Sequence, residues 1–393
     1  MGLMDKFDTV ANTLRELGTL GVDPFGVQID KVLSPTEGLI HGRPTILAGT
    51  NNYLGLTFDA GCIAAACAAL EHEGTGTTGS RMANGSYSGH RALEHELAQF
   101  YGKRDAIVFS TGYQANLGMI SALAGPGDVV LIDADSHASI YDGCRLGGAQ
   151  VIRFRHNDAE DLAKRMRRLG SAAKDALILV EGLYSMLGDR APLARIAQAK
   201  REFGGYLLVD EAHSMGVAGA GGRGVAEAEG VLEDVDFVVG TFSKSLGCVG
   251  GFCVSDYPQL DLVRYASRPY IFTASPTPAT IASVRHALRL LADGRALRDR
   301  LTHNAARLHA GLAALGYTLG APPSPVVAVI LADRITALKF WAGLLERGVY
   351  VNLMVPPATP NGESLVRCSI SAAHTPAQID AICAAFADLR AVA

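Results

Sequence analysis

Short apolar segments alternate with longer helix-like segments over most of the chain between about residues 45 and 275. The apolar segments are AIVFS (106–110), VVLID (129–133), VIRF (151–154), ALILVEG (176–182), YLLVD (206–210) and FVVGTF (237–242). Runs that are apolar throughout, rather than at every second residue, are typical of parallel strands, because connecting helices cover both faces of the sheet. The pattern therefore predicts an α/β fold with a mostly parallel sheet covered by helices.

The pattern changes after Pro276 and Pro278. One long helix is predicted over 281–315, followed by two strand-like segments, VVAVIL (326–331) and LVRCSIS (365–371), with a helix at 335–347 between them and another at the end. This order predicts a smaller α+β domain, with a boundary near 276–285. We expect an N-terminal helical segment (1–45), a large domain (46–280) and a small C-terminal domain (281–393).

Composition excludes several classes of protein. Of the 393 residues 49% are hydrophobic and 19% charged, which is typical of a globular enzyme and not of a disordered chain. The net charge of −4 provides no basic surface for nucleic acid. No apolar run is long enough to span a bilayer, although the amphipathic residues 1–20 could lie on a membrane surface. The seven cysteines form no CxxC pair, so we expect no metal site and reduced thiols in a cytoplasmic protein.

Three local patterns suggest a nucleotide-binding or metal site, but the sequence around them does not support such a site. GTGTTG (74–79) matches the dinucleotide-binding GxGxxG, but a helix-like segment precedes it where that motif needs a strand. DEAH (210–213) suggests a nucleotide hydrolase, yet the chain contains no GxxxxGK[ST] phosphate-binding loop. His72, His90 and His95 lack the spacing of metal ligands.

Four polar motifs follow predicted strands: TGY (111–113), DSH (135–137), DEAH (210–213) and TFSK (241–244). Because the carboxyl ends of parallel strands meet at one crevice, these motifs are expected to face a common ligand. Lys244 has glycines and small apolar residues around it and no carboxylate within seven residues on either side. Apolar surroundings disfavour the ammonium form and make a lysine reactive.

The other residues of these motifs suit one cofactor. Asp210 ends an apolar strand and supplies a buried negative charge, while Gly112 and Tyr113 open a helix whose N–H groups favour a phosphate. Thr241 and Ser243 add hydroxyl groups near Lys244. An amine, a phosphate site and a carboxylate for a ring nitrogen together predict pyridoxal 5′-phosphate (PLP).

Motifs over nearly the whole chain resemble the α-oxoamine synthases, PLP-dependent transferases of fold type I. The resemblance rests on TNNYLGLT (50–57), FSTGYQANLGMISALAG, DEAHSMG, TFSKS, RPYIFTAS and VRCSIS. It implies that Lys244 is the Schiff-base lysine and that Asp210 pairs with the pyridinium nitrogen. It also implies that His137 stacks on the ring and that His213 hydrogen-bonds the phenolic oxygen.

The same resemblance implies further contacts. The cofactor is expected to be lined by Gly112, Tyr113, Ser185, Thr241 and Ser243. Thr273 would reach the phosphate of a neighbouring subunit, which implies a homodimer. Asn52 and Arg367 would bind the substrate carboxylate.

Two residues depart from the family pattern. Thr78 stands where some members carry Asn, and Val355 stands where an Arg precedes PPATP. Without that second arginine, Arg367 would hold the carboxylate alone or with a shifted partner.

The stretches DADSHASIYDGCRLG, VIRFRHND, FVVGTFSKS and RPYIFTASP are most similar to members that condense L-serine with a long-chain acyl-CoA. The resemblance therefore implies a decarboxylative C-acyl transfer. Alternatives within the family are 8-amino-7-oxononanoate synthase or a glycine-using member. Outside it, a PLP aminotransferase or a binding protein without activity remains open.

Overall fold

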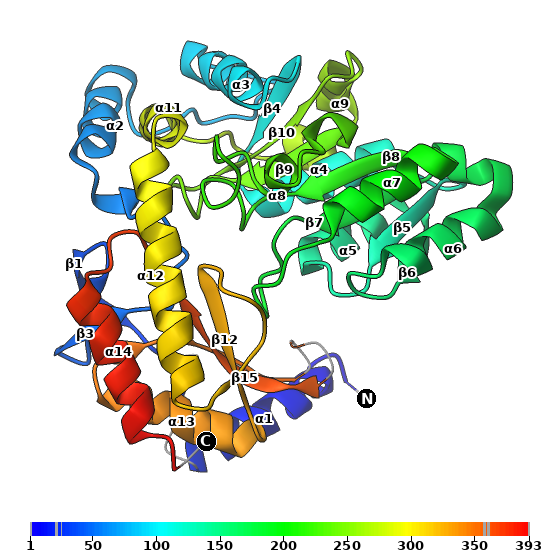
Figure 1. The fold of residues 1–393 in the computed structure, drawn as a ribbon. Helices are drawn as coiled ribbons and strands as arrows, with labels where there is room; N and C mark the ends of the chain where they lie inside the picture. Colours follow the sequence, from blue (N-terminus) through cyan, green and yellow to red (C-terminus); the bar gives the residue numbers. More distant parts are fainter. Residues whose placement is uncertain (1, 20–22, 25, 357–358, 360–361, 392–393) are drawn as a thin grey trace.

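The computed structural model describes residues 2–19, 23–24, 26–356, 359 and 362–391. A seven-stranded sheet in the order β4-β10-β9-β8-β7-β5-β6 lies in the upper part of the view in Figure 1. The strands are β4 (Asp105–Phe109), β5 (Val129–Asp133), β6 (Gln150–Phe154), β7 (Leu177–Glu181), β8 (Tyr206–Asp210), β9 (Phe237–Thr241) and β10 (Gly251–Ser255). Strands β6, β5, β7, β8 and β9 run parallel, whereas β10 is antiparallel to β4 and β9.

Both faces of this sheet are buried, as the uniformly apolar segments predict. Alternate residues belong to two separate cores: Ile107 and Val130 pack into one, Val108 and Leu131 into the other. The first core also contains side chains of α4 (Gly112–Leu123) and α5 (Ala138–Gly147), and the second those of α6 (Ala159–Leu169) and α7 (Leu193–Phe203). The predicted α/β fold with a mostly parallel, helix-covered sheet is confirmed.

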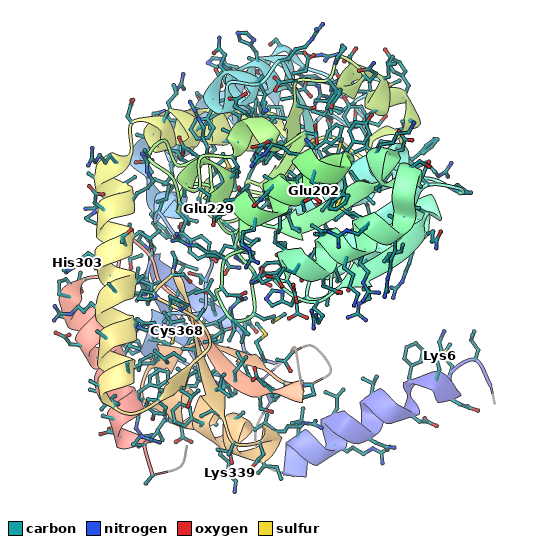
Figure 2. All side chains as sticks on the ribbon, turned by 45° about the vertical axis from the view of Figure 1, so that its right-hand side comes forward. Lys6, Glu202, Glu229, His303, Lys339 and Cys368 are labelled. Carbon is teal, nitrogen blue, oxygen red and sulfur yellow. The ribbon has the colours of Figure 1, made fainter. Side chains whose placement is uncertain are left out.

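A second sheet carries the C-terminal part of the chain. Its order is β11-β12-β15-β14, all antiparallel, with bounds Thr318–Leu319, Val326–Leu331, Ser364–Ser369 and Asn352–Met354. Helices α12 (Arg295–Ala314), α13 (Arg334–Glu346) and α14 (Pro376–Asp388) lie around it, and Cys368 lies within it (Figure 2). The predicted strands and helices of this region are confirmed.

The N-terminal 45 residues are less helical than expected. Helix α1 (Asp8–Thr19) is followed by strands β1 (Ile29–Ser34), β2 (Glu37–Ile40) and β3 (Arg43–Leu47). Tight turns join these strands, and β3 pairs in parallel with β13 (Val349–Tyr350) near the other end of the chain. The pairing partner is about 300 residues away, so local pattern gives little sign of these strands.

Two other elements differ from the sequence prediction. The long helix over 281–315 is divided into α11 (Pro278–Ala292) and α12, because the chain turns at Asp293 and Gly294. Strand β10 was not predicted, since its residues follow a run of glycines. Helices α2 (Ala60–Glu73) and α3 (Ser88–Tyr101) pack against α11, and α8 (Val225–Ala228), α9 (Leu260–Ala266) and α10 (Arg268–Ile271) are short.

Among the described residues, no helix is both long enough and apolar enough to cross a membrane.

Candidate active site

A cavity of about 280 Å³ opens at the carboxyl ends of the parallel strands. Eight of the residues predicted to bind the cofactor line it: Gly112, Tyr113, His137, Asp210, His213, Thr241, Ser243 and Lys244. They come from the last residues of β8 and β9 and from the segments that follow β4, β5, β8 and β9. The structure thus brings these eight predicted residues together.

A tight loop between β9 and β10 presents Lys244. The loop closes through hydrogen bonds from Phe242 N to Gly250 O (2.9 Å) and from Gly247 N to Lys244 O (3.0 Å). Gly247 has φ +65° and Gly250 φ +146°, values that residues with a side chain rarely adopt. The glycines after Lys244 therefore allow the chain to turn back at once and aim the amine at the cavity.

Burial changes the pKa of Lys244, and hydrogen bonds hold the carboxylate of Asp210 in place. Burial lowers the pKa of Lys244 to about 8, although Asp210 and Glu181 oppose this shift. Asp210 accepts hydrogen bonds from Asn116 Nδ2 (2.7 Å) and Ala212 N (2.9 Å). A neutral amine is therefore accessible near neutral pH, beside a carboxylate whose position is fixed.

Sequence reasoning missed three polar residues of this cavity, Asn116, Ser139 and Glu181. Asn116 lies on α4 and orients Asp210, while Glu181 ends β7 and accepts a hydrogen bond from His137 N (2.6 Å). Glu181 is opposite Asp210 in the β7–β8 register, a position that only the strand alignment reveals. Burial and the charge of Asp210 raise the pKa of Glu181 well above its usual value.

The two histidines hold different positions. His137 Nδ1 lies 2.7 Å from Ser139 Oγ, and its ring is edge-on to Tyr113 at 6.4 Å between centroids. His213 Nδ1 lies 2.7 Å from the hydroxyl of the buried Tyr53, another residue that the sequence did not single out. Burial lowers the pKa of both imidazoles, so both rings are neutral at pH 7.

Arg367, Asn52 and Ser185 lie outside this cavity. Arg367 is 5% exposed on β15 and donates to Ser185 O (2.7 Å). Its Nε has no hydrogen-bond partner, and no carboxylate forms an ion pair with it in the described part of the chain. Asn52 Oδ1 is likewise buried without a partner among the described residues. A buried guanidinium without a counter-ion is suited to an anionic ligand.

The remaining predicted residues lie further away. Thr273 does not line the cavity, and its hydroxyl accepts from Gln114 Nε2 (3.1 Å). Thr78 adopts φ +56°, a conformation that Asn accepts more readily than a β-branched residue. Val355 is described, but the PPATP motif after it lies partly outside the described residues.

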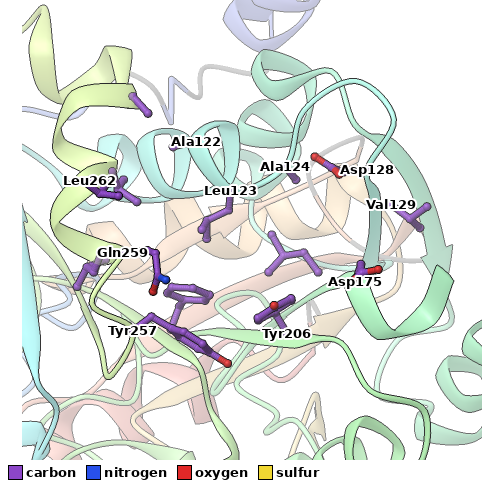
Figure 3. A pocket seen from close by; sticks show the side chains of 15 residues that line it. Ala122, Leu123, Ala124, Asp128, Val129, Asp175, Tyr206, Tyr257, Gln259 and Leu262 are labelled. Atoms are coloured by element: carbon purple, nitrogen blue, oxygen red, sulfur yellow. The ribbon is translucent and has the colours of Figure 1, made fainter. Parts of the chain in front are cut away.

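A larger cavity of about 1020 Å³ adjoins the first, and His137 lines both. Its other walls include Arg153, His156, Tyr184 and Ser185. A third cavity of about 500 Å³ lies at the opposite edge of the sheet, near the amino ends of β5, β7 and β8 (Figure 3). Aromatic and aliphatic side chains line most of it, together with Asp128, Asp175 and Gln259, and none of the predicted site residues lines it.

Comparisons with known proteins agree with this geometry. The model of the aminotransferase class I and II family matches residues 43–386. A serine palmitoyltransferase of Caulobacter vibrioides is 60% identical over 100% of this chain and 97% of its own length. The chain belongs to the serine palmitoyltransferase branch of the α-oxoamine synthases. It is therefore a PLP-dependent acyltransferase of fold type I.

A solved structure and a relative with a different name are also similar to this chain. A solved serine palmitoyltransferase with PLP as its internal aldimine has a TM-score of 0.97 and 52% identity, covering 100% of this chain and 99% of that one. An 8-amino-7-oxononanoate synthase of Geobacter metallireducens is 39% identical over 86% of this chain and 87% of its own length. The serine palmitoyltransferase of Caulobacter vibrioides is thus clearly more similar to this chain than this synthase is.

The residues of the 280 Å³ cavity fit PLP. Thr241 and Ser243 place two hydroxyl oxygens 2.8 Å apart beside the first turn of α4, where helix N–H groups have no carbonyl partner within the helix. A Cβ on Gly112 would lie 2.7 Å from Thr241 Cβ, so only glycine lets the backbone approach so closely. Asp210 suits a ring nitrogen and Lys244 an aldehyde, and Asn116 Oδ1 is a buried acceptor still without a partner among the described residues.

Proposed function

We propose that the protein condenses L-serine with a long-chain acyl-CoA such as palmitoyl-CoA, the first step of sphingolipid synthesis. A carbon–carbon bond forms between the serine α-carbon and the thioester carbonyl, and coenzyme A leaves as its thiol. The serine carboxylate leaves as CO2, which yields 3-ketodihydrosphingosine. Arg367 carries this proposal, because it is buried with no counter-ion among the described residues, and its charge acts on Lys244, so it supplies a carboxylate site near the cofactor site.

The residues of the cavity divide the chemistry between them. Bound PLP supplies an electron sink for negative charge at the amino-acid α-carbon. Asp210 keeps the ring nitrogen protonated, and His137 and His213 position the ring. Lys244, with its pKa lowered to about 8, takes and returns the α-proton.

Arg367 and Asn52 bind the serine carboxylate. The Arg367 guanidinium keeps an Nε donor without a partner among the described residues. Lys244 lies in the loop that follows β9 of the large sheet and Arg367 lies on β15 of the small one, so the substrate would bind between the proposed domains 46–280 and 281–393. Because both charged groups must meet one small substrate, the relative position of the two domains sets the affinity for serine.

The acyl-CoA would occupy the 1020 Å³ cavity, which meets the cofactor cavity at His137. Arg153 is exposed on its wall and suits the CoA phosphates. Tyr184, Met186 and Leu187 provide apolar surface on the walls of this cavity for the acyl chain.

The proposed assembly is a homodimer. Phe272 and Val249 are 71% and 60% exposed, and Val249 lines the cofactor cavity. Exposed apolar side chains beside a site are suited to contact with a second copy of the chain. In such a dimer, Thr273 of one subunit would reach the cofactor phosphate of the other.

The exposed Phe7 and Val10 of the N-terminal region suit a peripheral membrane contact. All seven cysteines are free, which supports a cytoplasmic location.

Release of free CoA, measured over a panel of amino acids and acyl-CoAs, tests this function. We expect serine to exceed alanine and glycine, and C16 to C18 acyl-CoA to exceed pimeloyl-CoA and acetyl-CoA. A site that hydrogen-bonds the serine hydroxyl rejects alanine strongly, whereas a merely small pocket discriminates by only about 1–3 kcal/mol. Faster release with alanine and pimeloyl-CoA would indicate an 8-amino-7-oxononanoate synthase instead.

A further inference from the structure

We propose that His156 is a positioning residue, an imidazolium clamp between Asp133 and Asp189 that fixes the loop 183–190 and through it Arg367. Because the clamp would act on the guanidinium that binds serine, this inference rests on the proposed function. His156 lies next to the site without lining the cofactor cavity.

Both ring nitrogens of His156 face carboxylates. Nδ1 lies 2.8 Å from Asp133 Oδ1 and Nε2 lies 2.7 Å from Asp189 Oδ2. Carboxylates only accept hydrogen bonds, so the ring can satisfy both only when each nitrogen carries a proton. Burial alone would lower the pKa of His156, but Asp133 and Asp189 outweigh it and raise that pKa to about 10.

The charges around the ring favour its cationic form. Asp135 Oδ2 lies 3.8 Å from Nδ1 and adds a third carboxylate, while the Tyr184 ring stands edge-on at 4.5 Å between centroids. The cations on the walls of the same cavity are Arg153 and Arg155, and Arg155 is paired with Asp158. Within the described residues, the only ion pairs of Asp133 and Asp189 are those with His156.

Asn157 adds a second tie between the same two carboxylates. Its N–H donates to Asp133 Oδ2 (2.9 Å), and its Nδ2 donates to Asp189 Oδ2 (2.6 Å). It adopts φ +54°, a left-handed conformation that Asn accepts more readily than most residues. The turn after β6 is thus shaped to join the end of β5 to Asp189.

Asp189 belongs to the loop that holds Arg367. Tyr184 N donates to Asp189 O (2.9 Å), and Gly188 N donates to Tyr184 O (3.1 Å). Ser185 O, within this closed loop, accepts from Arg367 Nη1 (2.7 Å). A continuous path of contacts therefore leads from Asp133 on the large sheet, through His156 and Asp189, to Arg367 on the small sheet.

The loop has little freedom to move on its other side. Gly188 packs against the small sheet so closely that a Cβ there would lie 2.1 Å from Val326 O. Without the charged clamp, the loop keeps this contact, but only the hydrogen bonds of Asn157 still tie it to β5. Ser185 O then no longer holds the guanidinium at one distance from the cofactor cavity, and serine binding suffers before the chemical step does.

The variants His156→Asn and Asp189→Asn test the clamp in the PLP-loaded enzyme. Asn at 156 keeps a donor for Asp133 but is too short to reach Asp189, and Asn at 189 removes only the charge. Serine is titrated against the absorbance of bound PLP without acyl-CoA, and kcat and KM are then measured. His303→Gln, on the outer face of α12 (Figure 2), is the matched control.

We expect both variants to weaken serine binding about 10-fold while kcat changes less than about 3-fold. PLP content should stay at the level of the control. The double variant should be little worse than either single one, because the two residues form one contact. Additive losses in the double variant, or a fall in kcat at unchanged serine binding, would overturn the inference.

Arg367→Lys separates this inference from the proposed function. If Arg367→Lys weakens serine binding and the two clamp variants do not, the clamp is wrong and the carboxylate site stands. If Arg367→Lys leaves serine binding unchanged, the carboxylate site itself is wrong and the clamp falls with it. Weakening by all three variants supports both.

Discussion

Two carboxyl groups, Asp210 and Glu181, lie side by side at the ends of β8 and β7. Asp210 receives two hydrogen bonds, whereas the pKa of Glu181 is raised by its burial and by the charge of Asp210. When two such groups share a dry cavity, one keeps the charge and the other the proton. We therefore propose Asp210 as the anion that would serve the ring nitrogen.

This division predicts unequal effects of two isosteric changes. Asp210→Asn removes the buried charge and should lower kcat/KM by about 10²–10³-fold, through a weaker electron sink. Glu181→Gln preserves the shape of the protonated acid and its contact with His137 N, so its loss should stay within about 10-fold. Steady-state kinetics of the two purified variants measures both effects. Equal losses would contradict the assignment of charge.

Lys244 predicts a dependence of stability on pH in the cofactor-free protein. Its pKa is about 8 in the folded chain, below the ordinary 10.5. Between these two values the unfolded state binds more protons, so the contribution of Lys244 to stability rises with pH through this range. The denaturant concentration at the unfolding midpoint should be measured for wild type and for Lys244→Met at pH 8 and at pH 10. The midpoint of wild type minus that of Lys244→Met should be larger at pH 10 than at pH 8. If the difference between the two midpoints were the same at pH 8 and pH 10, the pKa of Lys244 would not be lowered in the folded chain.

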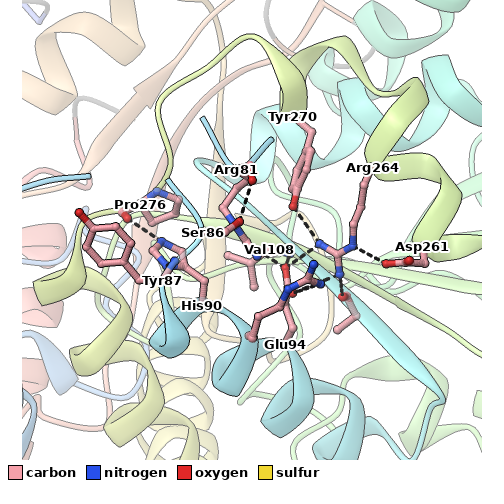
Figure 4. A network of polar contacts seen from close by, with 12 residues as sticks. Arg81, Ser86, Tyr87, His90, Glu94, Val108, Asp261, Arg264, Tyr270 and Pro276 are labelled. Atoms are coloured by element: carbon pink, nitrogen blue, oxygen red, sulfur yellow. Dashed lines mark hydrogen bonds and ion pairs between the residues drawn. The ribbon is translucent and has the colours of Figure 1, made fainter. Parts of the chain in front are cut away.

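At the scale of elements, a buried charge network joins α3, β4, α9 and α10 (Figure 4). Glu94 of α3 accepts from Arg81 (2.8 Å) and from Arg264 through two nitrogens (2.9 and 3.1 Å). Burial alone would raise the pKa of Glu94, but Arg264 and Arg81 outweigh it and lower that pKa. The carboxylate thus fixes α3 beside the segment that carries Thr273.

Glu94→Gln should lower the free energy of unfolding by about 3 kcal/mol, because the buried Arg81 loses its carboxylate partner and the buried Arg264 keeps only the exposed Asp261. Glu160→Gln is the control, since its pair with Arg195 is exposed and should contribute less than about 1 kcal/mol. Chemical denaturation at pH 7 measures both. Because the pKa of Glu94 is lowered, the difference should shrink in acid, as pH falls through the folded-state value. Equal losses in both variants would contradict the network.

Strands whose residues form a visible apolar run could be predicted, whereas short or glycine-rich strands could not. Strand β8 has the bounds read from YLLVD, because burial on both faces leaves its pattern in the residues themselves. Strands β3 and β13 pair across the whole chain, and β10 is hidden among glycines. The site residues show the same contrast. Lys244 and Asp210 lie at or after the ends of strands that the sequence makes visible, whereas only the register of β7 with β8 shows that Glu181 lies beside Asp210.

At the scale of the whole molecule, the proposed homodimer predicts that a charge at the exposed Phe272 dissociates the two chains. Phe272→Asp places a charge in the expected interface and should shift the mass measured by light scattering from two chains toward one. Leu262→Asp is the control, because Leu262 is similarly exposed, at 63%, but lines the cavity at the far edge of the sheet. Dissociation by both variants, or by neither, would contradict an interface at Phe272.

The central claim is that the chain joins serine to an acyl group and releases the serine carboxylate. Serine labelled with ¹³C at C1 distinguishes this reaction, because the label follows the carboxyl carbon. With palmitoyl-CoA and the purified enzyme, we predict that the label appears in CO2, in equal amount with free CoA, and that the long-chain amino ketone carries none. Label retained in a keto acid or in an acylated serine, or CoA released without labelled CO2, would contradict the account.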